Sequence, residues 1–309
     1  MPKTENYPKK GGIVENYEHE GQLFKALRES RGLTKVEVTK DICSDTTLIK
    51  FEKNGSNMGF RTFCQLLQRI GVTLTEFQYS MNYHELDDFK WLLSNVGTCY
   101  EEKRIDELRQ IVNQLEQELP QKKKVTYQKL NYLMVKTLLS YIDEETTLSE
   151  QEKEIIAGQH LFIEHWGYFE LTLFANTLDS LEKQNLIVLT RETIARSEFY
   201  QAIPENKSLI IQVLLNAMKT LIAEREYSVA KEVGVTIQEM LEDDDDHYTI
   251  IHMFTTGALE FSMDNFDVGL ELMERAIKIV ELLGRDYLVQ DYRSTYNTAL
   301  QHLENIKNG

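Results

Sequence analysis

Proline is scarce in this sequence: Pro2, Pro8, Pro120 and Pro204 are the only four among 309 residues. Because proline interrupts helices, its rarity favours an all-α protein, as do long segments in which apolar residues recur every three to four positions. The sequence also lacks an apolar run long enough to cross a bilayer, and it shows no signal peptide. We therefore expect a cytoplasmic protein without a membrane partner, and the length is enough for two domains.

Cysteine is equally sparse, and its three copies, Cys43, Cys64 and Cys99, are odd in number and widely spaced. This pattern fits reduced thiols in a cytoplasm rather than a disulfide framework. Cys43 lies just before the expected DNA-reading helix described below, where it could form an intermolecular disulfide. The alternative is that Cys43 is a small buried core residue, which is the more usual role of an unpaired cysteine.

The sequence patterns of catalytic and metal sites are missing. There is no nucleophile elbow, P-loop or dinucleotide-binding glycine motif, so we expect no enzymatic activity. His160 and His165 are five residues apart, as are His247 and His252, which places the members of each pair on different helix faces. The acidic run 242–246 lacks the glycine and alternating ligands of a calcium loop. We expect neither a metal nor a cofactor.

The formal net charge of −16 is unevenly distributed along the chain. Residues 1–81 carry 12 Lys and Arg against 10 Asp and Glu, whereas residues 82–309 carry 22 against 40. Phosphate repulsion would keep the acidic part away from nucleic acid. The asymmetry predicts a mildly cationic DNA reader joined to an acidic partner domain.

The segment from Ser44 to Lys53 predicts a helix that lies in the major groove of DNA. Ser44 has the hydroxyl of an N-cap, and the pair Asn54-Gly55 tolerates the left-handed backbone that ends a helix. Leu48 and Phe51 are three residues apart and point inward together. Four residues are left facing outward: Asp45, Thr46, Ile49 and Lys50.

Four further short helices are expected around this segment, over residues 21–31, 35–42, 60–70 and 73–81. Five short helices with a sharp turn before the third predict a helix-turn-helix domain. The stretches LFKALRESRGLTKVEV, CSDTTLIKFEKNGS and FCQLLQRIGVTLTEF resemble the phage-repressor type of this domain. Asp45 stands where that type commonly has Gln, and Ile49 stands where it commonly has Ser.

Double-stranded DNA is therefore the expected partner of this domain. We expect Lys50 to read guanine, Asp45 a cytosine amino group, and Thr46 a thymine methyl or a nearby phosphate. The alternative for Asp45 is that it orients Lys50 or caps the helix. Phosphate contacts are expected from residues near the helix ends: Arg28, Arg31, Lys35, Ser44 and Lys53.

From residue 86 onward the periodicity predicts stacked helical hairpins and a closing helix. The expected pairs are 86–96 with 101–119, 125–142 with 149–165, 168–184 with 190–201, 207–224 with 227–241, and 247–263 with 266–283, followed by 286–305. Small residues at Gly257, Ala258 and Gly269 make the fifth pair resemble a tetratricopeptide unit. The expected domains are a flexible segment 1–19, a helix-turn-helix domain 20–81 and a repeat domain 86–309.

The closing helix has apolar residues at a spacing of three to four: Leu288, Tyr292, Tyr296, Leu300 and Leu303. This stripe is available to hold a homodimer together. The alternative is that it caps the last repeat, because terminal repeats need a cap.

The DNA domain and three later stretches together resemble the Rgg/MutR-type regulators of Gram-positive bacteria, within the class of peptide-pheromone receptors. The later stretches are FELTLFANTLDSL, IIQVLLNAMKTLIAEREYSVAKEV and GALEFSMDNFDVGLELMERAIKIVELLG. The resemblance implies a homodimer that binds a short imported signalling peptide and regulates transcription in quorum sensing. The alternative function is a helical scaffold that binds protein partners, with a DNA domain that serves only to target it to DNA.

Asn131, Asn176 and Asn216 fall inside the first helix of three successive pairs, each within apolar sequence. First helices line the concave surface of a stacked-repeat domain. An asparagine amide both donates and accepts hydrogen bonds, so it can clamp the backbone of an extended peptide. We expect Asn176 and Asn216 to contact the peptide, with Asn131 as a third candidate. The alternative is that each bonds to a neighbouring helix of the same chain.

Overall fold

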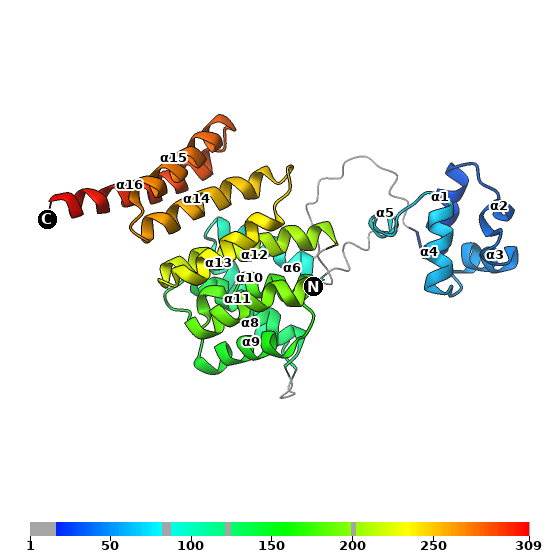
Figure 1. Cartoon of the computed structure of the whole chain (residues 1–309). Coiled ribbons are helices and arrows are strands. Elements are labelled where there is room, and N and C mark those ends of the chain that lie inside the picture. The colour runs from blue at the N-terminus through cyan, green and yellow to red at the C-terminus, as the bar shows by residue number, and fades with distance from the viewer. Residues whose placement is uncertain (1–16, 82–87, 121–124, 199–201, 309) are drawn as a thin grey trace. The chain divides into compact units, whose positions relative to one another are not determined.

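The computed structural model describes residues 17–81, 88–120, 125–198 and 202–308 (Figure 1). Within these ranges the chain is all-helical and has no strand, as the scarcity of proline predicted. It divides into two compact units, Met1–Asn95 and Val96–Gly309. In the described ranges no helix has both the length and the apolar character needed to cross a membrane. The expected flexible segment 1–19 and the connector at 82–85 lie almost wholly outside the described residues.

Five short helices form the first unit: α1 (Glu20–Ser30), α2 (Lys35–Thr39), α3 (Asp45–Asn54), α4 (Phe60–Arg69) and α5 (Leu74–Ser80). A sixth helix, α6 (Asp88–Glu101), runs across the division between the units. Hydroxyl caps start three of the five: Thr34 and Thr73 each form a capping box, and Ser44 accepts from the amide of Thr47. Gly32 and Gly55 take positive φ after α1 and α3. The predicted five-helix domain is confirmed.

The turn between α2 and α3 begins earlier than the sequence predicted. α2 ends at Thr39 rather than at residue 42, and Asp41 takes a left-handed φ of 63°. The amides of Ile42 and Cys43 bond back to the carbonyl oxygen of Thr39 at 2.9 and 3.1 Å. Two amides are thus satisfied by one carbonyl, and the chain changes direction before α3 begins.

The core of the first unit is built around a group of phenylalanines, Phe24, Phe51, Phe63 and Phe77, whose neighbouring ring centroids are 5.0 to 6.4 Å apart. α1 and α3 pack against each other at Gly21, where a Cβ atom would lie 1.9 Å from the carbonyl oxygen of Phe51. Only glycine permits this approach, so Gly21 fixes how α1 supports α3.

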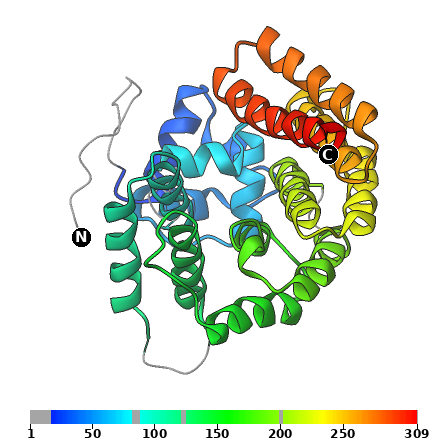
Figure 2. The same ribbon diagram turned by 90° about the vertical axis from the view of Figure 1, so that its left-hand side faces the viewer.

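The second unit contains α7 (Ile105–Gln117), α8 (Tyr127–Ser140), α9 (Glu150–Phe162), α10 (Tyr168–Ala175), α11 (Lys183–Ser197), α12 (Pro204–Ala223), α13 (Tyr227–Met240), α14 (Asp246–Ser262), α15 (Phe266–Leu282) and α16 (Asp286–Asn308). α10 packs on α12 and α12 on α14, while α9 packs on α11 and α11 on α13. In Figure 2 the helices from α8 to α16 follow one another around an arc. This is the layered arrangement of stacked helical hairpins that the periodicity predicted.

The third expected hairpin differs from its prediction. One helix was expected over 168–184, but α10 ends at Ala175, a short 3-10 turn follows at Leu178–Ser180, and α11 begins at Lys183. At the end of α10, the Nδ2 of Asn176 donates to the carbonyl oxygen of Thr172 at 2.7 Å. A polar side chain that bonds to its own helix in this way competes with continuation of the helix.

The fifth hairpin, α14 with α15, is held together through small residues. A Cβ atom on Gly257 would lie 2.8 Å from the carbonyl oxygen of Gly269, and one on Gly269 would lie 2.6 Å from the backbone nitrogen of Phe261. α16 covers this hairpin: Tyr292 stacks on Phe254 with ring centroids 3.8 Å apart, and Leu288 and Tyr296 pack against the same core. These three stripe residues therefore act as a cap.

Candidate nucleic-acid interface and the asparagines of the second unit

The outward side of α3 is defined by what its inward side buries. Leu48, Phe51 and Glu52 are buried in the first unit. Four exposed residues recur here at a spacing of three to four, and we call them the α3 outward face: Thr46, Ile49, Lys50 and Lys53. Among the described residues, neither lysine of this face forms an ion pair. Both cations are therefore available to an anionic partner.

Three other predicted phosphate contacts precede α3 in the sequence. Ser44 is exposed and caps α3, with its Oγ 3.2 Å from the Thr47 backbone nitrogen. Lys35, at the start of α2, is half-buried. Arg31 is exposed, and one of its nitrogens donates to the carbonyl oxygen of Leu27 at 2.9 Å. All three side chains remain reachable from solvent.

Arg28 requires a correction, because its guanidinium is buried. Its Nε and Nη2 donate to the two carboxylate oxygens of Glu52 at 2.7 and 3.0 Å, and its Nη1 donates to the carbonyl oxygen of Leu33 at 2.7 Å. The side chains of Arg28 and Glu52 are 5% and 3% exposed. The hydrogen bonding of the guanidinium to the Glu52 carboxylate is the main cause that raises the pKa of Arg28. The expected phosphate contact by Arg28 is wrong, because this charge is already paired inside the unit.

Asp45, at the start of α3, is half-buried and already has a partner. The hydroxyl of Thr39, at the end of α2, donates to its Oδ1. The carboxylate therefore braces the turn between the two helices, which favours that role over a contact with cytosine. Cys43, in the same turn, is a free, half-buried cysteine, and burial raises the pKa of its thiol.

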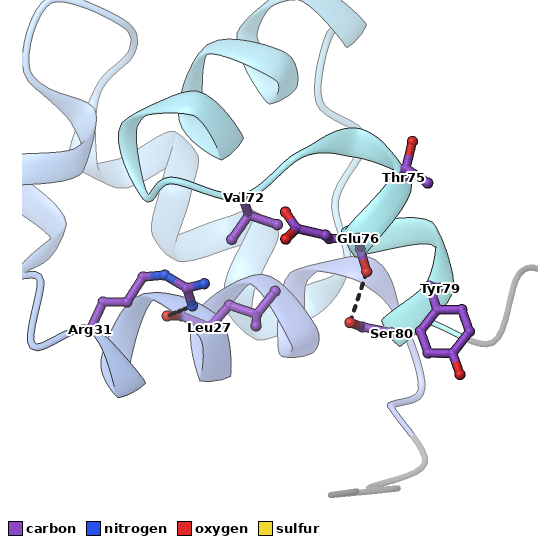
Figure 3. A pocket seen from close by; sticks show the side chains of 7 residues that line it. All are labelled: Leu27, Arg31, Val72, Thr75, Glu76, Tyr79 and Ser80. Atoms are coloured by element: carbon purple, nitrogen blue, oxygen red, sulfur yellow. Dashed lines mark hydrogen bonds between the residues drawn. The ribbon is translucent and has the colours of Figure 1, made fainter. Parts of the chain in front are cut away.

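A pocket of about 450 Å³ lies between the end of α1 and α5 (Figure 3). Its lining residues are Leu27, Arg31, Val72, Thr75, Glu76, Tyr79 and Ser80. Several of its polar groups bond within the unit: Ser80 donates to the carbonyl oxygen of Glu76 at 2.8 Å, and the Glu76 carboxylate caps α5 through Thr73. The bonds from Thr73 and the charge of Arg31 lower the pKa of Glu76. The hydrogen bonds lie within α5 and its cap, and the charge of Arg31, at the end of α1, acts on the Glu76 carboxylate across the pocket.

The three asparagines of the second unit have different surroundings. The side-chain amide nitrogen of Asn176 already donates a hydrogen bond to the carbonyl oxygen of Thr172 at the end of α10. Asn131, on α8, has a buried carbonyl oxygen without a hydrogen-bond partner in the described structure. Asn216, on α12, is half-buried, and among the described residues its side chain has no hydrogen bond. One turn later, Thr220 donates to the carboxylate of Asp179 at 2.7 Å. Asn216 thus retains an amide group that a ligand can satisfy, whereas the unpaired oxygen of Asn131 is enclosed by the protein.

Sequence reasoning missed two positioning residues in the first unit. Glu52 was not singled out, although a carboxylate beside Phe51 and four residues after Leu48 falls on the buried side of α3. Arg69, on α4, was also missed; its two terminal nitrogens donate to the carbonyl oxygens of Glu37 and Lys40 at 3.1 and 3.2 Å. A charged residue on an apolar helix face was the available signal for Glu52. Nothing local marked Arg69.

The family described as "HTH-type transcriptional regulator Rgg, C-terminal domain" matches residues 112–294. Among solved structures, the SHP pheromone receptor Rgg2 of Streptococcus dysgalactiae is 21% identical with a TM-score of 0.79, and the match covers 91% of this chain and 99% of that one. A candidate transcriptional regulator from Listeria monocytogenes EGD-e is 20% identical with a TM-score of 0.78, covering 93% and 99%. The PrgX/cCF10 complex is 13% identical with a TM-score of 0.66, covering 90% and 98%. These structures share the fold of this chain across both units.

Proposed function

The chain belongs to the family of HTH-type transcriptional regulators called Rgg, and from that premise we propose a DNA-binding regulator controlled by a short signalling peptide. In this proposal the protein acts in the cytoplasm as a homodimer. The first unit reads double-stranded DNA, and the second unit binds the peptide. The family is one of regulators, and the proposal includes no enzymatic step.

The α3 outward face is the observation that carries the DNA-binding part. An α-helix fits the major groove, and an ammonium group at its surface can donate to the acceptor atoms of guanine. Lys50 takes this role. Lys53, Arg31, Lys35 and Ser44 contact the phosphates on either side, and each phosphate contact releases counterions from the DNA.

The homodimer follows from the small size of one reading helix. A single helix-turn-helix domain reads only a few base pairs, so specificity requires two domains on two half-sites. A symmetric pair of this chain would place two α3 helices on successive turns of the duplex.

The peptide-binding part rests on the repeat unit and on the relatives of its fold. One relative is a receptor for an SHP pheromone, and another was solved in complex with cCF10. In this proposal the side-chain amides of Asn216 and Asn131 form hydrogen bonds with the peptide backbone. Asn176 accepts one through its side-chain carbonyl oxygen, because its nitrogen is already bonded. A peptide that binds two arrangements of the dimer with different affinity would shift their populations, and thereby change DNA binding.

The test is a titration of the full-length protein on the DNA upstream of its own reading frame, with a shuffled duplex of equal composition as control. We expect tighter binding to the upstream DNA at about 150 mM salt, where non-specific contacts are weakened. We also expect one synthetic peptide, taken from short reading frames encoded nearby, to change this affinity by about 5–150-fold. Equal affinity for both duplexes would contradict the DNA part, and a lack of response to every peptide would contradict the peptide part.

A further inference from the structure

Ile49 occupies the middle of the α3 outward face and is apolar. It lies three residues after Thr46 and four before Lys53, with Lys50 beside it. The residue is 42% exposed, although the core of the first unit is one residue away at Leu48. Single exposed apolar residues are ordinary on protein surfaces. This one stands where the proposed function places the edges of base pairs.

The groups around Ile49 favour DNA as its partner over an apolar protein surface. The lysines at positions 50 and 53 lie on the same side and have no ion pair in the described structure. An apolar protein partner would bury or crowd these cations without neutralising them, at a cost in desolvation. A DNA duplex neutralises both with phosphates or base acceptors while it covers the isoleucine.

Ile49 can recognise only one kind of group in the major groove. It has no donor or acceptor, so any polar base atom that it covers loses water and gains no hydrogen bond. Among the edges of the four bases in that groove, the apolar group is the C5-methyl of thymine. A β-branched side chain in a helix is held in one strongly preferred χ1 rotamer, so its methyl groups are placed in advance. A fixed apolar contact of this kind distinguishes thymine from the other bases, and it does so at one position of the half-site.

We propose that Ile49 recognises the C5-methyl group of a thymine in each half-site of the operator. This inference rests on the proposed DNA-binding function and adds to it a base that the operator must contain. The Asp45 carboxylate is half-buried and accepts a hydrogen bond from the Thr39 hydroxyl. It therefore does not compete with Ile49 for the base edges beside it.

The experiment begins with selection of the full-length protein on a randomised double-stranded DNA pool. The enriched duplex is then resynthesised with deoxyuridine in place of each thymine in turn. Deoxyuridine keeps every hydrogen-bonding group of thymine and lacks only the methyl. At one position per half-site, we expect this change to weaken binding by about fourfold, the effect of burying one methyl group. The Ile49→Ala variant should bind the thymine and deoxyuridine duplexes equally at that position.

The matched control is Val235→Ala, which truncates another exposed β-branched residue, 56% exposed, on α13 of the second unit. It should keep the full sensitivity to deoxyuridine. The proposal is overturned if no thymine is sensitive in the wild type, or if the Ile49→Ala variant is as sensitive as the wild type. If the wild-type protein enriches no sequence at all, the DNA-binding function itself fails, and that result is distinct from the other two.

Discussion

Arg28 and Glu52 are 24 positions apart in the sequence, and two hydrogen bonds of 2.7 and 3.0 Å join them in the core of the first unit. The pair connects the last turn of α1 to the last turn of α3. The same guanidinium also binds the carbonyl oxygen of Leu33, just before α2. One buried cation therefore holds together the elements that present the α3 outward face.

The first prediction concerns this ion pair. The Glu52→Ala variant should lower the free energy of unfolding of the first unit by ~3–5 kcal/mol, because it leaves a buried, uncompensated arginine. The measurement is hydrogen exchange of the α1 and α3 amides in increasing urea. Glu29→Ala is the control, because Glu29 contacts the same guanidinium from a side chain that is 54% exposed. Its cost should stay below ~1 kcal/mol. Equal losses in the two variants would contradict the account.

Salt dependence tests the phosphate contacts. A Lys53→Ala dimer should lose about two units from the slope of log affinity against log salt, close to one for each subunit. The slope is measured by fluorescence anisotropy of the selected duplex over a range of potassium chloride concentrations. Lys278→Ala, which removes an exposed lysine of α15 in the second unit, should leave the slope unchanged. An unchanged slope for Lys53→Ala would mean that this end of α3 does not contact the phosphates of the DNA.

Two glycines of the second unit should respond to alanine in opposite directions. Gly257→Ala forces a Cβ atom to 2.8 Å from the carbonyl oxygen of Gly269 and should cost ~1–3 kcal/mol of stability. Gly158→Ala, in α9, meets no atom within 4 Å and should stabilise by ~0.5–1 kcal/mol, because it removes backbone freedom from the unfolded chain. Urea unfolding measures both. The reverse order of the two effects would contradict the close packing of α14 on α15 at Gly257.

His160 predicts how the stability of the second unit depends on pH. The ring is fully buried between Trp166 and Phe174, with centroids 4.8 and 5.3 Å away, and burial lowers its pKa to about 3. Unfolding restores a pKa near ~6.5, so the unfolded chain binds a proton that the folded chain rejects. The free energy of unfolding should therefore fall as the pH drops below about 6.5. This imidazole contributes ~1.4 kcal/mol to that fall for each pH unit.

The comparison that isolates this effect uses two variants. His160→Phe should remove that part of the slope between pH 6 and 5, where carboxylates contribute little. His165→Phe, at an exposed position five residues later, should retain most of it. Parallel curves for the wild type and His160→Phe would show that this ring is not the titrating group.

The helices of the first unit could be predicted because their signals are local. Thr34, Ser44 and Thr73 mark helix starts, and Gly55 marks a helix end, within four residues of where each acts. Arg28 was misassigned because its partner lies 24 residues away. Sequence spacing places a charge on a helix, but it does not show which distant carboxylate reaches that charge. The break after α10 was missed for a related reason. From the sequence alone, Asn176 fits a ligand contact as well as it fits the end of a helix.

The central claim is that DNA and peptide bind at two separate sites of this regulator, and one comparison tests it directly. The affinities of Lys50→Ala and Asn216→Ala are measured for the selected duplex and for the peptide that alters wild-type binding. We expect Lys50→Ala to lose DNA affinity and keep peptide affinity. Asn216→Ala should keep DNA affinity without peptide and lose ~1–3 kcal/mol of peptide affinity, roughly fivefold to hundredfold. A folded Asn216→Ala protein with normal peptide affinity, or a Lys50→Ala protein with normal DNA affinity, would contradict the account.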